Sequence, residues 1–323
     1  LKGTVLLLLV LAFFTGFSLK APRGMKAMGA LAGAATASFL VEAFQLYVGG
    51  DLLGIKFLGE VGASAGSMGG VAAAILVPLA LGVSPVYAVL LGVVCGGMGI
   101  IPGFIAGYVM SFIIPKLEEK IPDGLDLIVI ICLAAPLGRG IAQFVSPGVT
   151  FALQTIGDII IAAQSASPYV MAFILGGVIT VVATAPISSM ALTAMLGLTG
   201  LPMAIGALAV MASSFMNFVF FDRMKFGDRS TTIAVAIEPL TQADIISANP
   251  IPVFTTNFIG GGIAGMIVNY FGLINNATGT ATPIAGFAVM FGFNPAKEVL
   301  ITAGLCAVAG IATGYIGSIV FKN

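Results

Sequence analysis

The sequence has 323 residues, of which 59% are hydrophobic and only 8% are charged, and its formal net charge is zero. A soluble globular chain carries about 25% charged residues, so this composition excludes a water-soluble domain and predicts a protein that crosses a membrane several times. The neutral balance also excludes the basic surface that nucleic-acid binding needs.

Apolar runs long enough to cross a bilayer, which takes about 20 residues, follow one another along the chain. They are far longer than the alternating segments of a β-barrel, so we predict an all-α fold. Charged or polar connectors separate them, notably "KAPRGMK" at 20–26, "PKLEEKIPDGLD" at 115–126 and "DRMKFGDRS" at 222–230. We expect about nine or ten transmembrane helices: near residues 3–19, 27–48, 62–83, 85–114, two around "GRG" at 138–140, then 168–185, 201–221, 252–274 and 298–321.

Two short apolar segments are interrupted by proline and glycine and share one layout. "TAPISSMALTAMLGLTGLP" covers 184–202, and "TGTATPIAGFAVMFGFNP" covers 278–295. Non-helical backbone at membrane depth has to be buried in protein or line a cavity, and paired segments of this kind point to a transporter's binding site. We therefore predict two re-entrant hairpins, near 184–202 and 275–295. Kinks in ordinary spans are the alternative.

The segment "EPLTQADIISANPIP", which begins at Glu238, is the strongest candidate for a binding site. A charge within lipid costs at least about 2.5–3.5 kcal/mol, and Glu238 directly follows an apolar run. Gln242, Asn249 and Asn257 come after it, while residues 231–256 contain no Lys or Arg. A carboxylate accepts hydroxyl protons and an amide both donates and accepts, so this set is suited to holding a polyol. A solvated connector is the alternative.

Four further residues are secondary candidates for contacts with a substrate. Glu60 precedes a run of small residues, and Arg139 has a glycine on each side. Arg139 is suited to approaching a ligand or the backbone closely, or to a structural ion pair with Glu60 or Asp158. Ser188 and Ser189 would add hydroxyls from the first hairpin, although serine in a membrane helix often bonds the carbonyl one turn back.

We expect no catalytic site, metal or cofactor on this chain. It contains no histidine, and Cys95, Cys132 and Cys306 each lie alone in an apolar run, so no metal or redox spacing is present. The glycine-rich "GGGIAG" at 260–265 lies inside an apolar span and lacks the lysine of a phosphate-binding loop. It is typical of a close-packed helix face.

Three stretches carry a family resemblance: "APISSMALTAMLGLTGLPMAIGALAV", "EPLTQADIISANPIPVFTTNFIGGGIAGM" and "TGTATPIAGFAVMFGF". Over nearly its whole length the chain resembles the IIC membrane components of the bacterial phosphoenolpyruvate–sugar phosphotransferase system, and most of all the PfoR-like, type 2 IIC branch. Many glucose-type members carry a G-[IV]-T-E-P signature whose Glu contacts the sugar. Here "VAIEPLTQ" keeps Glu238 and Pro239 but lacks the Thr and has Ala236 in place of Gly. The resemblance implies, on a partial motif, that Glu238 contacts sugar.

The resemblance further implies an α-helical carrier with re-entrant hairpins that works as a homodimer by moving a transport domain. It also implies that separate IIA and IIB proteins carry the phosphorylated His and Cys, which agrees with the absence of histidine here. We expect one IIC-like membrane domain over 1–323, with a helical scaffold part at 1–125 and the hairpins in 126–323.

We therefore predict a multi-pass carrier of the bacterial inner membrane that translocates a sugar or polyol by alternating access, without enzymatic activity of its own. The first alternative is an ion-coupled secondary transporter of a small polar or anionic solute, in which Glu60, Asp158 or Glu238 would carry the ion. The second is a membrane sensor or regulator that binds a ligand without moving it. Dependence on an ion gradient, or binding without flux, separates these alternatives from the carrier.

Overall fold

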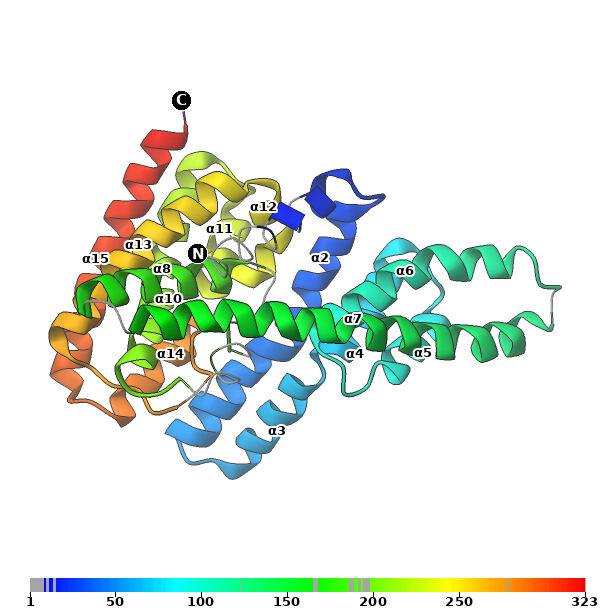
Figure 1. Cartoon of the computed structure of the whole chain (residues 1–323), viewed down its shortest axis with the longest axis horizontal. Coiled ribbons are helices and arrows are strands. Elements are labelled where there is room, and N and C mark those ends of the chain that lie inside the picture. Colours follow the sequence, from blue (N-terminus) through cyan, green and yellow to red (C-terminus); the bar gives the residue numbers. More distant parts are fainter. Residues whose placement is uncertain are drawn as a thin grey trace.

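The computed structural model describes residues 9, 12–13, 16–122, 124–164, 168–185, 189–190, 193, 198–277 and 279–322. Within these residues all regular elements are helices, and the one β-type pairing is an isolated bridge between Gly200 and Asn275 (Figure 1). The predicted all-α fold is confirmed.

Most of the elements are α-helices, while η1 and η2 are π-helical and η3 and η4 are short 3₁₀ turns. Their order is α2 (Gly24–Ala35), η1 (Thr36–Leu40), η2 (Ala43–Leu52), α3 (Lys56–Ser67), α4 (Gly69–Leu81), α5 (Pro85–Val94), α6 (Ile100–Glu118), α7 (Asp126–Gln164), α8 (Pro168–Thr184), α10 (Gly200–Met224), α11 (Arg229–Ile237), η3 (Pro239–Gln242), α12 (Ala243–Ala248), α13 (Pro250–Phe271), α14 (Pro283–Val289), η4 (Met290–Gly292) and α15 (Ala296–Phe321).

Six helices in the described part are long and apolar enough to cross a membrane: Gly24–Leu52, Ile100–Glu118, Asp126–Thr155, Gly200–Met224, Pro250–Phe271 and Ala296–Phe321. A seventh results if α3 and α4, which meet at a bend of 54°, form one broken span. The number is below the predicted nine or ten for two reasons. The predicted span at 3–19 falls mainly outside the described residues, and three apolar runs form helices of only 10–17 residues, namely Pro85–Val94, Pro168–Thr184 and Pro283–Gly292.

Glycine and proline explain why the predicted span at 85–114 is two helices. Pro85 occupies the first turn of α5, where its missing N–H costs nothing. After α5, Gly97 takes a φ of 73°, which residues with a Cβ adopt only with strain. α6 then begins anew at Ile100. The hydropathy of this stretch is continuous, so the break lies in its backbone chemistry.

Glycines also allow α8 and α13 to pack closely against each other. A Cβ on Gly261 would lie 2.6 Å from the carbonyl oxygen of Gly176, and one on Gly265 would collide with the carbonyl oxygen of Ala172. Interfaces between membrane helices are enriched in such small residues because dispersion contacts hold them together. The prediction that 260–265 is a close-packing face is confirmed.

The hydrophobic core falls into a large part and a smaller one. The large part joins α2 and α4 to α8, α10, α13 and α15. The smaller part lies among α4, α5, α6 and the first half of α7, and Figure 1 shows these helices extending to one side of the rest. The long α7 runs from this arm back to the larger core. The division into a scaffold at 1–125 and a hairpin-bearing part at 126–323 stays a prediction.

Candidate functional site

Glu238 lies at a break between two short helices. α11 ends at Ile237 and η3 begins at Pro239, and a proline disfavours helical backbone in the residue before it. Glu238 is accordingly extended, with φ −150° and ψ 102°. Its N–H donates to the carbonyl of Ala234 at 3.0 Å, and its carbonyl accepts from the Thr241 hydroxyl at 2.8 Å. The main chain is thus satisfied, and the side chain starts from a fixed point.

The carboxylate of Glu238 has one satisfied oxygen and one unsatisfied oxygen. The side chain is buried, with 9% of its surface exposed. The carboxylate accepts hydrogen bonds from the backbone N–H of Leu240 and from the side chain of Thr282. Its Oε2 atom is buried and has no partner in the described part of the chain. Because an unpaired buried acceptor is costly, this atom is a natural place for a donor supplied by a ligand.

Burial also changes the acidity of Glu238, which lies between the spans Gly200–Met224 and Pro250–Phe271. Removal from water raises the pKa of the carboxyl from its ordinary 4.5 to about 7, because desolvation disfavours the charged form. The hydrogen bonds from Leu240 and Thr282 act in the opposite direction. Near neutral pH the group is therefore present in both protonation states.

Thr282 belongs to a loop held by its own hydrogen bonds. The Nδ2 group of Asn275 donates to the hydroxyl of Thr280 at 2.8 Å, and that hydroxyl donates to the carbonyl of Ala277 at 2.8 Å. The N–H of Thr282 donates to the carbonyl of Thr280 at 2.8 Å. These bonds fix the loop directly before α14, at the start of the second predicted hairpin.

The segments of the two predicted hairpins meet each other. The N–H of Asn275 donates to the carbonyl of Gly200 at 3.0 Å, and the N–H of Gly200 donates to Oδ1 of Asn276 at 3.2 Å. The hydroxyl of Ser189 donates to the carbonyl of Ala281 at 2.8 Å. Ser189 thus binds the residue next to Thr282, and the described parts of both segments join beside Glu238. Their re-entrant course in a membrane stays a prediction.

Gln242 and Asn249 lie in the same segment as Glu238 and are half-buried. Nε2 of Gln242 donates to the hydroxyl of Thr241 at 3.3 Å. Nδ2 of Asn249 donates to the carbonyl of Ile245 at 3.0 Å, one turn back. Each amide thus uses a donor within its own segment and keeps its carbonyl oxygen as an acceptor.

Asn257 is fully buried between α10 and α13, where sequence reasoning expected a ligand contact. Its Nδ2 group donates to Oδ1 of Asn217 at 2.8 Å, and Nδ2 of Asn217 donates back at 3.3 Å. The Nδ2 group of Asn257 also reaches the carbonyl of Val253 at 2.9 Å. This reciprocal amide pair connects the two helices.

The remaining candidates lie elsewhere or outside the described residues. The guanidinium of Arg139, on α7, donates to the carbonyls of Val94 and Gly96 at 3.0 and 2.7 Å, just where α5 ends. Helix ends leave carbonyls without partners, so Arg139 satisfies the end of α5. Glu60 is exposed on α3. Ser188 lies outside the described residues.

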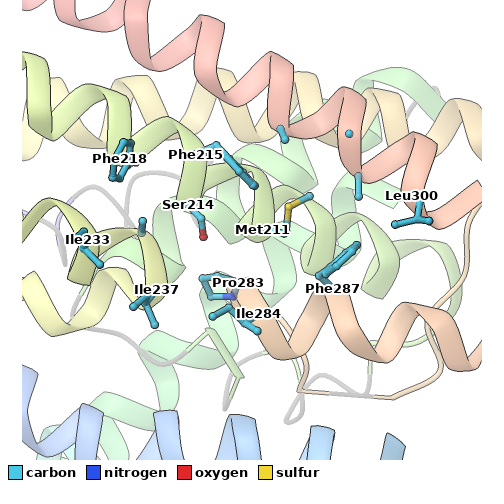
Figure 2. Close-up of a pocket in the computed structure, with 14 residues that line it drawn as sticks. Met211, Ser214, Phe215, Phe218, Ile233, Ile237, Pro283, Ile284, Phe287 and Leu300 are labelled. Atoms are coloured by element: carbon cyan, nitrogen blue, oxygen red, sulfur yellow. The ribbon is translucent and has the colours of Figure 1, made fainter. Parts of the chain in front are cut away.

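A cavity of about 700 Å³ lies on the other side of the two chain segments that carry Glu238 and Thr282 (Figure 2). Ile237 and Pro283 line it, whereas Glu238 and Thr282 do not. Ser214 contributes the one hydroxyl of the lining, and its Oγ has no partner in the described part. Sugar sites need several converging polar groups, so this cavity is not suited to a sugar. Its lining residues are Met211, Ser214, Phe215, Phe218, Ile233, Ala236, Ile237, Pro283, Ile284, Phe287, Leu300, Ala303, Gly304 and Ala307.

The geometry combines a buried carboxylate, a free acceptor oxygen and two joined chain segments within a membrane protein. A family model described as "Phosphotransferase system, EIIC" matches residues 25–323. The chain belongs to the phosphotransferase-system EIIC family. No curated protein and no solved structure matches the chain.

Family membership gives this EIIC protein a role as the sugar-transporting membrane component of a phosphotransferase system. In such systems other components transfer the phosphoryl group, so IIA and IIB proteins are its implied partners. Its apolar helices agree with a multi-pass membrane protein. The placement in the PfoR-like branch stays a prediction.

Sequence reasoning missed Thr282, Asn275 and Asn217. The threonines and asparagines of "NNATGTATP" were visible, and this run opens the second copy of the repeated layout. What the sequence did not contain was the fold that brings Thr282 to Glu238. For Asn217, a lone amide in an apolar run, the signal was its high cost in lipid without a partner.

Proposed function

We propose that Glu238 is the central sugar-binding residue of this EIIC protein and that the substrate is a sugar or polyol. The observation that carries the proposal is the buried Oε2 of Glu238, which has no partner in the described part of the chain. A ligand hydroxyl would donate to this atom in a charge-assisted bond, about twice as strong as a neutral one. Gln242, in the same segment, is the next candidate because its carbonyl oxygen has no assigned partner among the described residues.

The other predicted contacts have secondary places in this proposal. Ser189 stands closest to the site through its bond to Ala281. The amides of Asn249 and Asn257 and the guanidinium of Arg139 already bond to protein groups. In this conformation those bonds stabilise the fold, and a ligand would have to displace them.

The proposal includes transport by alternating access, as a homodimer in the bacterial inner membrane. Family membership and the paired interrupted segments support a carrier in which joined chain segments present the site. The substrate would be phosphorylated with the help of IIA and IIB proteins. The family match favours this reading over an ion-coupled transporter or a sensor.

Equilibrium binding to the purified protein tests the site. We would measure the dissociation constants of radiolabelled hexoses and hexitols for the wild-type protein and for Glu238→Gln. The substitution keeps the shape but removes the charge, so binding of the tightest panel member should weaken by at least about tenfold, the effect of losing a bond to a charged acceptor. Unchanged affinity in a folded Glu238→Gln variant would contradict the assignment.

A further inference from the structure

Thr282 is the only side chain reported to hydrogen-bond the carboxylate of Glu238 within the described residues. The other donor is the backbone N–H of Leu240. Because Oε2 has no partner, both bonds fall on Oε1. One oxygen is therefore held by the protein, and the other is left free in the same buried place.

We propose that Thr282 is a positioning residue of the sugar site: its hydroxyl holds Oε1 of Glu238 so that Oε2 is presented to a ligand hydroxyl. This inference rests on the proposed function, because it assumes that Glu238 binds the sugar. Thr282 itself need not touch the sugar. It acts through the orientation of the carboxylate.

The local structure holds Thr282 in place for this role. It is 3% exposed, and its backbone is extended, with φ −142° and ψ 151°, as the following Pro283 favours. Its carbonyl accepts the N–H of Gly286 at 3.0 Å in the first turn of α14, and its N–H bonds to Thr280. The peptide before it is fixed by the bond from Ser189 to the carbonyl of Ala281.

Two donors on one oxygen fix the plane of a carboxylate better than one. With only the Leu240 N–H remaining, the carboxylate of Glu238 could rotate about its last side-chain torsion, which has broad minima. A site group has to be held within about 0.5 Å and 10–20° of its working geometry. The site is therefore composite, since it is complete only while the loop at 275–282 lies against Glu238.

The test compares Thr282→Val, which removes the hydroxyl at nearly constant shape, with Thr282→Ser, which retains it. The probe is the hexose or hexitol that binds the wild-type protein most tightly. We expect Thr282→Val to weaken binding about tenfold, the scale of one hydrogen bond to a charged group, and Thr282→Ser to restore it. Thr302→Val is the matched control, because the Thr302 hydroxyl on α15 is buried without a partner in the described part. Its affinity should match the wild type.

The outcomes separate this inference from the proposed function. If Glu238→Gln loses binding but folded Thr282→Val binds like the wild type, the positioning role is wrong and the proposed site stands. If Thr282→Ser folds and binds as weakly as Thr282→Val, the hydroxyl is not what matters, and the inference is again overturned. If Glu238→Gln binds normally, or no panel member binds, the proposed function itself fails. Should Thr282→Val not fold, the smaller Thr282→Ala replaces it with the same expected loss.

Discussion

Sugar binding by this EIIC protein should depend on pH through Glu238. With a pKa of about 7, roughly one tenth of the carboxyl groups are ionised at pH 6 and roughly nine tenths at pH 8. A ligand hydroxyl donates to the ionised form, and apparent affinity scales with the fraction of protein that is competent to bind. The raised pKa therefore means weak binding below pH 7 and tighter binding above it. From pH 6 to pH 8 the dissociation constant should fall about tenfold.

The assay is equilibrium binding of the tightest hexose or hexitol to purified protein at pH 6, 7 and 8, with constant ionic strength. Glu238→Gln cannot ionise and should give weak binding that is independent of pH. Glu298→Gln is the control, because Glu298 is exposed at the start of α15, and it should keep the wild-type pH profile. A flat profile in the wild-type protein, or a tenfold change that survives in Glu238→Gln, would refute the reasoning.

Two further predictions concern the packing that positions the site. Asn257→Leu should lower stability by about 1–3 kcal/mol because it leaves the buried amide of Asn217 unpaired, whereas the double Asn217→Leu/Asn257→Leu variant should melt closer to the wild type. A double variant that melts below the single one would contradict this. Gly261→Ala should lower the melting temperature, since its Cβ would collide with Gly176 and overpacking costs about 1–3 kcal/mol. Gly304→Ala, which has open space around it, should not, and equal melting of both variants would argue against close packing of α8 and α13.

Composition and pattern predicted the parts of the fold that depend on local chemistry. The long apolar runs gave the helices, and "GGGIAG" gave the close packing of α8 and α13. Glu238 was found because a carboxylate next to an apolar run is costly in lipid. The repeated layout at 184–202 and 278–295 marked two segments that the structure brings together through Gly200 and Asn275.

What the sequence could not supply were pairings between distant residues. Asn257 has the chemistry of a sugar contact, but Asn217, 40 residues earlier, takes up its amide. Arg139 could have faced a ligand, but the open carbonyls at the end of α5 bind it. Number of spans was overpredicted because hydropathy does not show where glycine breaks a helix, as at Gly97. In each case the deciding partner is set by tertiary packing.

The most direct test of the carrier role is uptake of the labelled hexose and hexitol panel into membrane vesicles that contain this EIIC protein. Uptake would be measured with and without phosphoenolpyruvate and the soluble phosphotransferase proteins of the host, and again with an imposed ion gradient alone. The account predicts that a phosphorylated sugar accumulates only when phosphoenolpyruvate and the soluble proteins are present. Accumulation of unmodified solute driven by the gradient alone, or binding with no flux under any condition, would contradict it.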